Sequence, residues 1–234
     1  MKVSIIIPVF NEEKTIALIV EKVKAAKLPK GVDKEILVVD DASTDTTSRI
    51  VKKLAGLRFF RHKVNRGKGA SIKTAFGKAR GEIVIIQDAD LEYDPADYVK
   101  LLAPILMGKT TVVFGSRFSN LKFTLFGKGK TPLPLHFIGN KILTSLTNGL
   151  FGSHLTDMET CYKVFVKKIL DLNEIKASRF DFEPEFTAKI LKKGLTICEI
   201  PITISPRGYN EGKKITWRDG LVAIKVLLRE RLGK

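Results

Sequence analysis

The segment Glu82-Ile83-Val84-Ile85-Ile86-Gln87-Asp88-Ala89-Asp90 places two carboxylates directly after a short apolar run. The run is rich in β-branched residues and shows no polar alternation, which predicts a strand buried on both faces of a parallel sheet. Open α/β sheets bind their ligands at the carboxyl ends of the strands. We therefore expect Asp88 and Asp90 at a ligand-binding edge of the sheet.

Two acids at the end of a buried strand need a positive partner, because unpaired buried charge is costly. Mg²⁺ and Mn²⁺ prefer oxygen ligands and commonly bring a substrate's phosphates with them, so either ion is the expected occupant. The alternative interpretation is a helix cap. Asp94-Pro95 has the pattern of such a cap, but a cap does not account for Asp88.

The rest of the first half alternates between strand and helix patterns. This alternation predicts an α/β fold with a mostly parallel central sheet flanked by helices. No Gly-x-Gly-x-x-Gly motif follows the first strand, so dinucleotide binding of the dehydrogenase kind is not supported. The expected strands are residues 3–9, 35–40, 57–62, 82–88 and 111–116, and the expected helices are residues 13–26, 45–54, 68–79 and 95–107.

The 234 residues carry a formal net charge of +16. Such a charge predicts a polyanionic partner, either nucleic acid, anionic lipid or a phosphorylated substrate, although solvated helix faces also account for it. Acids at the strand ends would repel the phosphates of a nucleic acid, so nucleic acid is not the expected partner. Cys161 and Cys198 lack the spacing of metal ligands, which indicates a reducing compartment.

Polar residues also follow the other predicted strands. Asn11 and Glu12 follow the first strand, and Asp41 follows the second. The ends of parallel strands lie side by side, so we expect these residues to share one crevice with Asp88. Asp41 has two interpretations, as an acceptor of hydrogen bonds from a ribose or a base edge and as a local cap.

The segment Asn65-Arg66-Gly67-Lys68-Gly69-Ala70 joins the third strand to its helix. Its glycines allow a ligand to approach the backbone closely. A helix N-terminus with two cations favours an anion such as a diphosphate. A surface turn explains the segment equally well.

Five segments occur in one order: Pro8-Val9-Phe10-Asn11-Glu12-Glu13, Val38-Val39-Asp40-Asp41-Ala42-Ser43-Thr44-Asp45, Asn65-Arg66-Gly67-Lys68-Gly69, Asp88-Ala89-Asp90 and Gly115-Ser116-Arg117. Together they resemble the inverting family-two glycosyltransferases of GT-A fold, specifically the dolichyl- or polyprenyl-phosphate sugar synthases. The resemblance covers nearly the whole chain. It implies transfer of a hexosyl group, with inversion, from a nucleotide sugar of the GDP-mannose or UDP-glucose type to a polyprenyl or dolichyl phosphate.

The resemblance also implies roles for particular residues. Asp88 and Asp90 correspond to the family's metal-binding Asp-x-Asp, with Asp90 counted among the catalytic residues, and the metal would be Mg²⁺ or Mn²⁺. Asp41 corresponds to the aspartate that binds the nucleotide. Glu92 stands where relatives often have glutamine or histidine, so it is either a third metal ligand or a solvent-facing acid. The remaining contacts to the nucleotide sugar are expected from Pro8, Asn11, Glu12, Lys68 and Ala89.

A lipid phosphate needs cations rather than a base, because a second pKa of about 6 leaves it largely a dianion at neutral pH. Arg117 and Arg207, each at an expected strand end, are the candidate cations, and the other acceptor-phosphate contacts are expected from Lys130 and Asn140.

A hydroxyl acceptor of a sugar, lipid or protein would instead need a carboxylate base within reach. In relatives with hydroxyl acceptors, an acid in the region of Asp157 serves as that base. For a lipid phosphate, Asp157 would orient a cation or the sugar, so its catalytic role stays open. A transferase of this fold with a hydroxyl acceptor is the alternative function.

Residues 1–206 are expected to form the transferase domain, and residues 207–234 a basic loop and an amphipathic helix on the same domain. We expect loop 207–215 to close over the crevice. Residues 132–151 and 217–234 have the pattern of either membrane-interface helices or ordinary packing helices. No apolar stretch reaches about 18 residues, so any membrane contact is expected to be peripheral, at the cytoplasmic face of the membrane.

Overall fold

The computed structural model describes residues 1–119, 134–205 and 217–233. These residues form a seven-stranded sheet with the order β3-β2-β1-β4-β6-β5-β7. The strands are β1 (Lys2–Val9), β2 (Asp33–Asp40), β3 (Arg58–Arg61), β4 (Ile83–Ile86), β5 (Val112–Ser116), β6 (Lys163–Val166) and β7 (Ile197–Pro201). The helices are α1 (Ile16–Ala25), α2 (Thr47–Lys53), α3 (Lys68–Lys78), α4 (Tyr98–Leu106), α5 (Pro134–Phe151), α6 (Phe182–Lys192) and α7 (Trp217–Leu232).

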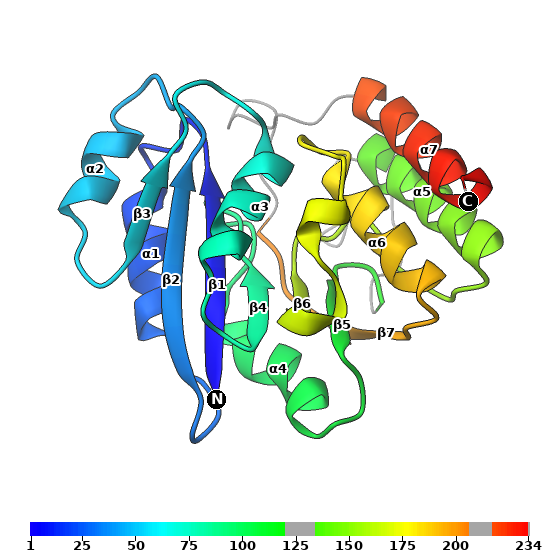
Figure 1. Cartoon of the computed structure of the whole chain (residues 1–234), viewed down its shortest axis with the longest axis horizontal. Coiled ribbons are helices and arrows are strands. Elements are labelled where there is room, and N and C mark those ends of the chain that lie inside the picture. Colours follow the sequence, from blue (N-terminus) through cyan, green and yellow to red (C-terminus); the bar gives the residue numbers. More distant parts are fainter. Residues whose placement is uncertain (120–133, 206–216, 234) are drawn as a thin grey trace.

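The centre of the sheet is parallel. β1 pairs with β2 on one side and with β4 on the other, and every residue of β1 after Lys2 is buried. Continuous apolar strands of this kind need helices on both faces. Figure 1 shows α3 in front of the sheet and α1 behind it. The predicted α/β class, with a mostly parallel sheet flanked by helices, is confirmed.

β6 interrupts the parallel order. It pairs antiparallel with β4 on one side and with β5 on the other, and it lies outside the strands that the sequence pattern predicted. Because β6 runs in the opposite direction, its first residue lies near the edge where β4 and β5 end. Cys161, which lies just before β6, is thereby brought next to Asp88.

β4, the strand before Asp88, is shorter than the range 82–88 expected from the sequence. It ends at Ile86, so Asp88 and Asp90 lie in the turn that follows β4. The next turn begins with Asp94, whose Oδ1 atom accepts a hydrogen bond from Ala96 N at 3.0 Å. This contact confirms the cap that Asp94-Pro95 predicted, and the cap involves neither Asp88 nor Asp90.

A second, smaller core lies under α5, α6 and α7. Leu143 from α5, Ala188 from α6 and Leu227 from α7 are among its buried residues. Figure 1 shows these three helices together, on the side of the molecule away from β3. Within the described ranges, none of the helices combines the length and the apolar character that crossing a membrane requires.

Candidate active site

The carboxyl ends of three parallel strands carry unusual backbone conformations. Asn11 after β1, Ala42 after β2 and Leu91 after β4 have φ angles of 51°, 63° and 67°. Non-glycine residues in this region cost of order 1–3 kcal/mol each and persist where the surroundings impose them, most often at functional sites. These strained residues therefore lie at the edge of the sheet where Asp88 and Asp90 were expected to bind a ligand.

The loops after β1 and β2 are tied to each other. Asn11 N donates to Ser43 Oγ at 2.9 Å, and Asn11 Oδ1 accepts from Thr44 N at 2.8 Å. Glu12 N donates to Thr47 Oγ1 at 2.9 Å. The structure thus places Asn11 and Glu12 where the loops after β1 and β2 are joined by hydrogen bonds, and their contact with a nucleotide stays a prediction. Pro8 is a buried residue of β1.

Asp41 organises the loop before α3. Its side chain is buried and accepts hydrogen bonds from Arg66 N at 2.9 Å and from Gly67 N at 2.6 Å. His62 Nδ1 lies 2.7 Å from the same carboxylate. Asp41 therefore holds the Asn65–Gly67 loop in place in this structure, and a nucleotide contact is a further role that it retains as a prediction.

The glycines of this loop serve close packing within the chain. Gly67 has a φ of 94°, and a Cβ there would clash with the carbonyl oxygen of Ser178 and the side chain of Arg179. A Cβ on Gly69 would lie 3.0 Å from Phe182 Cβ. These contacts press the N-terminus of α3 against the start of α6 and so place Lys68 beside the candidate metal site.

Lys68 joins several acidic groups at the strand edge. Its Nζ atom lies 2.9 Å from Asp88 Oδ1, 2.9 Å from Glu183 Oε1 and 3.3 Å from Cys161 Sγ. Burial alone would lower the pKa of Lys68, but Asp88, Cys161 and Glu183 raise it well above its ordinary value. Lys68 is therefore a charged ammonium, with its side chain 15% exposed, in contact with one of the two expected metal ligands.

The turn after β4 presents the expected metal ligands. Asp90 Oδ1 accepts a hydrogen bond from Glu92 N at 3.0 Å, which bends the chain sharply at Leu91. Ala89 between the two aspartates is buried. Over the described residues, no group of three or more acidic, histidine or cysteine side chains is placed so that it could hold a metal ion. Ligation by Glu92 together with Asp88 and Asp90 thus stays a prediction.

The donor set nevertheless fits a hard divalent cation. Mg²⁺ is usually bound by one or two carboxylates together with substrate phosphates and waters, so a preformed cluster of three protein ligands is not required. Two buried carboxylate oxygens next to this edge, Glu159 Oε1 and Glu183 Oε2, have no hydrogen-bond partner. Burial, followed by repulsion from Glu183, raises the pKa of Glu159 to about 8. This excess of acidic groups is what a bound cation would relieve.

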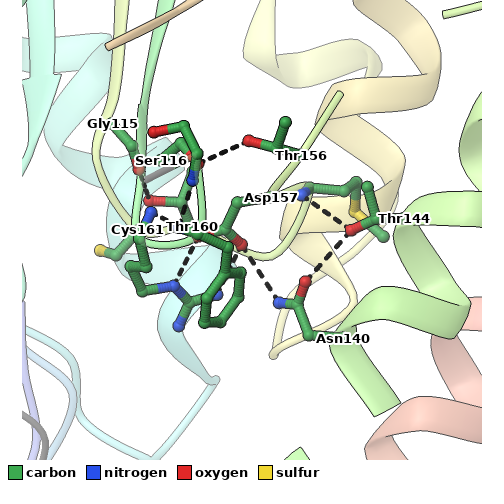
Figure 2. A network of polar contacts seen from close by, with 12 residues as sticks. Gly115, Ser116, Asn140, Thr144, Thr156, Asp157, Thr160 and Cys161 are labelled. Atoms are coloured by element: carbon green, nitrogen blue, oxygen red, sulfur yellow. Dashed lines mark hydrogen bonds and ion pairs between the residues drawn. The ribbon is translucent and has the colours of Figure 1, made fainter. Parts of the chain in front are cut away.

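A second group of residues surrounds Asp157, which is fully buried. Its Oδ2 atom accepts from Arg117 N at 3.0 Å and from Arg117 Nε at 2.6 Å. Its Oδ1 atom accepts from Arg117 Nη2 at 2.7 Å and from Asn140 Nδ2 at 3.1 Å. Figure 2 shows Asn140 linked in turn to Thr144. The structure therefore unites three predicted residues, Arg117, Asn140 and Asp157, in one network.

Arg117 stays charged in this position. Burial alone would lower its pKa, but Asp157 raises the pKa well above the ordinary value. The side chain of Arg117 retains 18% of its exposure, and a cavity of about 380 Å³ opens beside it. Lys100, Ser119 and Thr203 also line this cavity, which gives it a positive and polar wall suited to a phosphate.

Two acids of this region, Glu159 and Glu183, were not predicted from the sequence. Both lie far along the chain from Asp88, and neither has a spacing that links it to the Asp-x-Asp segment. Glu183 shares the first turn of α6 with Glu185, a pattern that indicates only a helix N-terminus. The predicted acceptor residues Lys130 and Arg207, and the whole of loop 207–215, lie outside the described residues.

The mostly parallel sheet with helices on both faces has the fold of the GT-A glycosyltransferases. The chain belongs to the Glycosyl transferase family 2, which matches residues 4–172. It superposes on the crystal structure of glucosyl-3-phosphoglycerate synthase from Mycobacterium tuberculosis in complex with Mn²⁺, UDP and phosphoglyceric acid with a TM-score of 0.74 and 19% identity. The superposition covers 99% of this chain and 78% of that one, and it confirms the predicted GT-A fold.

Three relatives are similar in sequence. An uncharacterized protein of Methanocaldococcus jannaschii is 33% identical over 86% of this chain and 80% of its own length. The low-salt glycan biosynthesis hexosyltransferase Agl6 of Haloferax volcanii is 30% identical over 96% of this chain, which spans only 52% of that relative. The UDP-N-acetylglucosamine–dolichyl-phosphate N-acetylglucosaminyltransferase of Methanococcus voltae is 27% identical over 98% of this chain and 96% of its own length. The resemblance to family-two enzymes is thus confirmed.

Proposed function

We propose that this glycosyltransferase moves a hexosyl group, with inversion, from a nucleotide sugar to a polyprenyl or dolichyl phosphate. The relative from Methanococcus voltae, which this chain matches over nearly its whole length, is named for a dolichyl-phosphate acceptor. The observation that carries the proposal is the number of hydrogen bonds that the Asp157 carboxylate accepts. Its two oxygens accept four hydrogen bonds from Arg117 and Asn140, which use the roughly four lone-pair sites of a carboxylate.

A carboxylate in this state is not available to take a proton from a hydroxyl. An acceptor that needs no base is therefore favoured, and a phosphate dianion is such an acceptor. Arg117 is fixed by Asp157 at the wall of a polar cavity, where its remaining donors would bind the phosphate. The alternative with a hydroxyl acceptor and Asp157 as base has no support from this geometry.

In the proposed reaction, a phosphate oxygen attacks the anomeric carbon while the bond from that carbon to the nucleoside diphosphate breaks. Asp88 and Asp90 would hold Mg²⁺ or Mn²⁺ on the diphosphate of the donor. The bound ion would neutralise the charge that develops on the leaving group. We propose that the nucleotide sugar is held by the residues that the sequence predicted for it, which are Pro8, Asn11, Glu12, Asp41, Lys68 and Ala89.

The acceptor can be tested directly. The chain would be incubated with Mn²⁺ and radiolabelled nucleotide sugars, supplied with either polyprenyl phosphate or the free polyprenol. We expect labelled lipid only with the phosphate, and none from Asp90→Asn or in the presence of EDTA. Transfer to the free polyprenol, together with loss of turnover in an Asp157→Asn variant that remains folded, would instead establish the hydroxyl mechanism.

We further propose that α5 and α7 contact an anionic membrane surface, peripherally and at its cytoplasmic face. The two helices pack on each other and leave several apolar side chains exposed. The exposed cations of α7 would complement anionic lipids. The exposed apolar residues are Ile138, Ile142, Leu221, Val222, Leu228 and Leu232, and the exposed cations include Arg218, Lys225 and Arg231.

Sedimentation with lipid vesicles tests this contact. We expect binding to vesicles that contain phosphatidylglycerol, weaker binding to pure phosphatidylcholine, and release by salt. The double substitution Leu228→Asn and Leu232→Asn should reduce the binding without unfolding the chain, because both side chains are exposed. Binding that is indifferent to lipid charge and to these substitutions would contradict the proposal.

A further inference from the structure

Lys68 occupies an unfavourable position for a cation unless acids surround it. It is the first residue of α3, where the helix dipole disfavours positive charge. Its ammonium forms ion pairs with two carboxylates, because Asp88 Oδ1 and Glu183 Oε1 each lie 2.9 Å away. It is also 3.2 Å from Asp88 Oδ2 and 3.3 Å from Cys161 Sγ. A divalent cation on Asp88 would face this ammonium at close range.

Glu183 can bind the Lys68 ammonium without help from Asp88. It lies in the first turn of α6, where the helix dipole favours a negative charge, and it is 5% exposed. Its Oε1 atom contacts Lys68, whereas its Oε2 atom is buried and has no hydrogen-bond partner. The flexible stem of a lysine allows the ammonium to bridge both oxygens of one carboxylate after a small rotation.

We propose that Glu183 is a positioning residue for the metal site, which draws the Lys68 ammonium away from Asp88 when a divalent cation binds there. The inference rests on the proposed metal site at Asp88 and Asp90. Without the charge of Glu183, Asp88 would be the only carboxylate among the described residues in contact with the ammonium. The incoming cation would then have to displace the ammonium without a second carboxylate to accept it. Glu183 thereby raises the affinity of Asp88 for a divalent cation, because it binds the Lys68 ammonium that the cation displaces.

Binding of Mn²⁺ alone, measured by electron paramagnetic resonance of the free ion, tests this role without any measurement of turnover. We expect Glu183→Gln to weaken Mn²⁺ binding by about 10–100-fold, the usual effect of removing a residue that supports a metal ligand. Glu174→Gln is the matched control, because Glu174 is an exposed acid away from the site, and it should bind Mn²⁺ as the unmodified chain does. Asp88→Asn should abolish the binding, which assigns the signal to this site.

The double-mutant cycle with Lys68→Met separates the proposed role from a general effect of charge. Lys68→Met should bind Mn²⁺ at least as tightly as the unmodified chain, because the competing ammonium is gone. In the Lys68→Met background, Glu183→Gln should change the affinity far less than it does alone. An undiminished loss in that background, or weaker binding by Lys68→Met itself, would overturn the inference.

The outcomes also distinguish the inference from the proposal beneath it. If the unmodified chain binds no Mn²⁺, or if Asp88→Asn binds it equally well, the metal site itself is wrong. If the unmodified chain binds Mn²⁺ through Asp88 and Glu183→Gln binds it with the same affinity, only the role of Glu183 is wrong. Thermal unfolding of each variant verifies that a loss of binding does not reflect a loss of structure.

Discussion

Two ionisable side chains, Lys163 and Glu199, form hydrogen bonds with the backbone of the segment that leads from Thr156 to β6. Lys163 is fully buried, its ammonium lies 4.5 Å from the centre of the Phe114 ring, and it donates to the carbonyl oxygens of Met158 and Thr160. Burial lowers the pKa of Lys163. Glu199 supports the same segment from the other side by accepting hydrogen bonds from Thr156 N at 2.7 Å and Asp157 N at 2.9 Å. Each of these side chains constrains where Asp157 lies.

Replacement of Asp157 by asparagine would leave the Arg117 guanidinium buried without its counter-ion. Breaking a buried pair in this way typically costs about 3–5 kcal/mol. We therefore expect Asp157→Asn to lower the free energy of unfolding, measured by urea denaturation, by an amount of this order. Asp33→Asn, at an exposed position, should leave the free energy of unfolding nearly unchanged. An Asp157→Asn chain as stable as the unmodified one would show that the pair is not structural.

Glu159 predicts a specific dependence of stability on pH. Burial and the nearby Glu183 raise its pKa to about 8 in the folded chain. The folded state therefore holds this proton more tightly than the unfolded state, and the associated stability is present at low pH and is lost as the pH rises through about 8. In EDTA, the melting temperature of the unmodified chain should fall by a few degrees more than that of Glu159→Gln between pH 6 and pH 9. Parallel pH profiles for the two chains would contradict this assignment.

At the scale of elements, the site depends on how closely α3 approaches the chain before α6. Ala70 N donates to the carbonyl oxygen of Ser178 at 2.9 Å, and Gly67 leaves no room for a side chain against the same residue. This contact places the ammonium of Lys68 between Asp88 and Glu183. A small displacement of α3 would thus disturb the charge balance of the metal site without touching its ligands.

Gly67→Ala tests this packing. The added Cβ would clash with backbone and would also occupy a left-handed conformation, so we expect a loss of roughly 1–3 kcal/mol in the free energy of unfolding. Gly77→Ala, inside the α3 helix that follows Gly67, is the control, since a Cβ there meets nothing within 4 Å. It should stabilise the chain by up to about 1 kcal/mol. Urea denaturation of both variants measures the difference, and equal effects would refute the packing argument.

At the scale of the whole molecule, α6 joins two cores, because Phe186 packs in the core of the sheet and Ala188 packs in the second core with α5 and α7. β5 and β7 pair in parallel, and Ile197 in β7 packs against both cores. Asn140 on α5 reaches back to Asp157, so the helical group also supplies a residue to the candidate site. The helical group therefore contributes to the site and is not separate from it.

Two neighbouring leucines in α7 test how firmly this helix belongs to the fold. Leu227 is fully buried against the second core, whereas Leu228 is 39% exposed. Leu227→Ala should lower the free energy of unfolding by about 2–5 kcal/mol, the usual cost of emptying a core position. Leu228→Ala should have little effect on stability. Similar small losses from both substitutions would mean that α7 is not tied to the rest of the molecule.

The local pattern of the chain determined the parallel half of the sheet and the acids at its edge. A strand such as residues 83–86 is recognisable because its apolar, β-branched run needs burial whatever surrounds it. Asp88 and Asp90 were found for the same reason, since their position depends only on the end of that strand. The ordered set of short segments then pointed to family-two glycosyltransferases, and the match over residues 4–172 confirms this.

Only the tertiary structure decided the partners of these residues. The antiparallel placement of β6, the pairing of Asp157 with Arg117 and the approach of Glu183 to Lys68 all join residues that are distant in the chain. Such contacts follow from topology and close packing, which no local spacing encodes. The sequence by itself therefore determined that Asp88 and Asp90 follow a buried strand, and the folded chain decided which charges they meet.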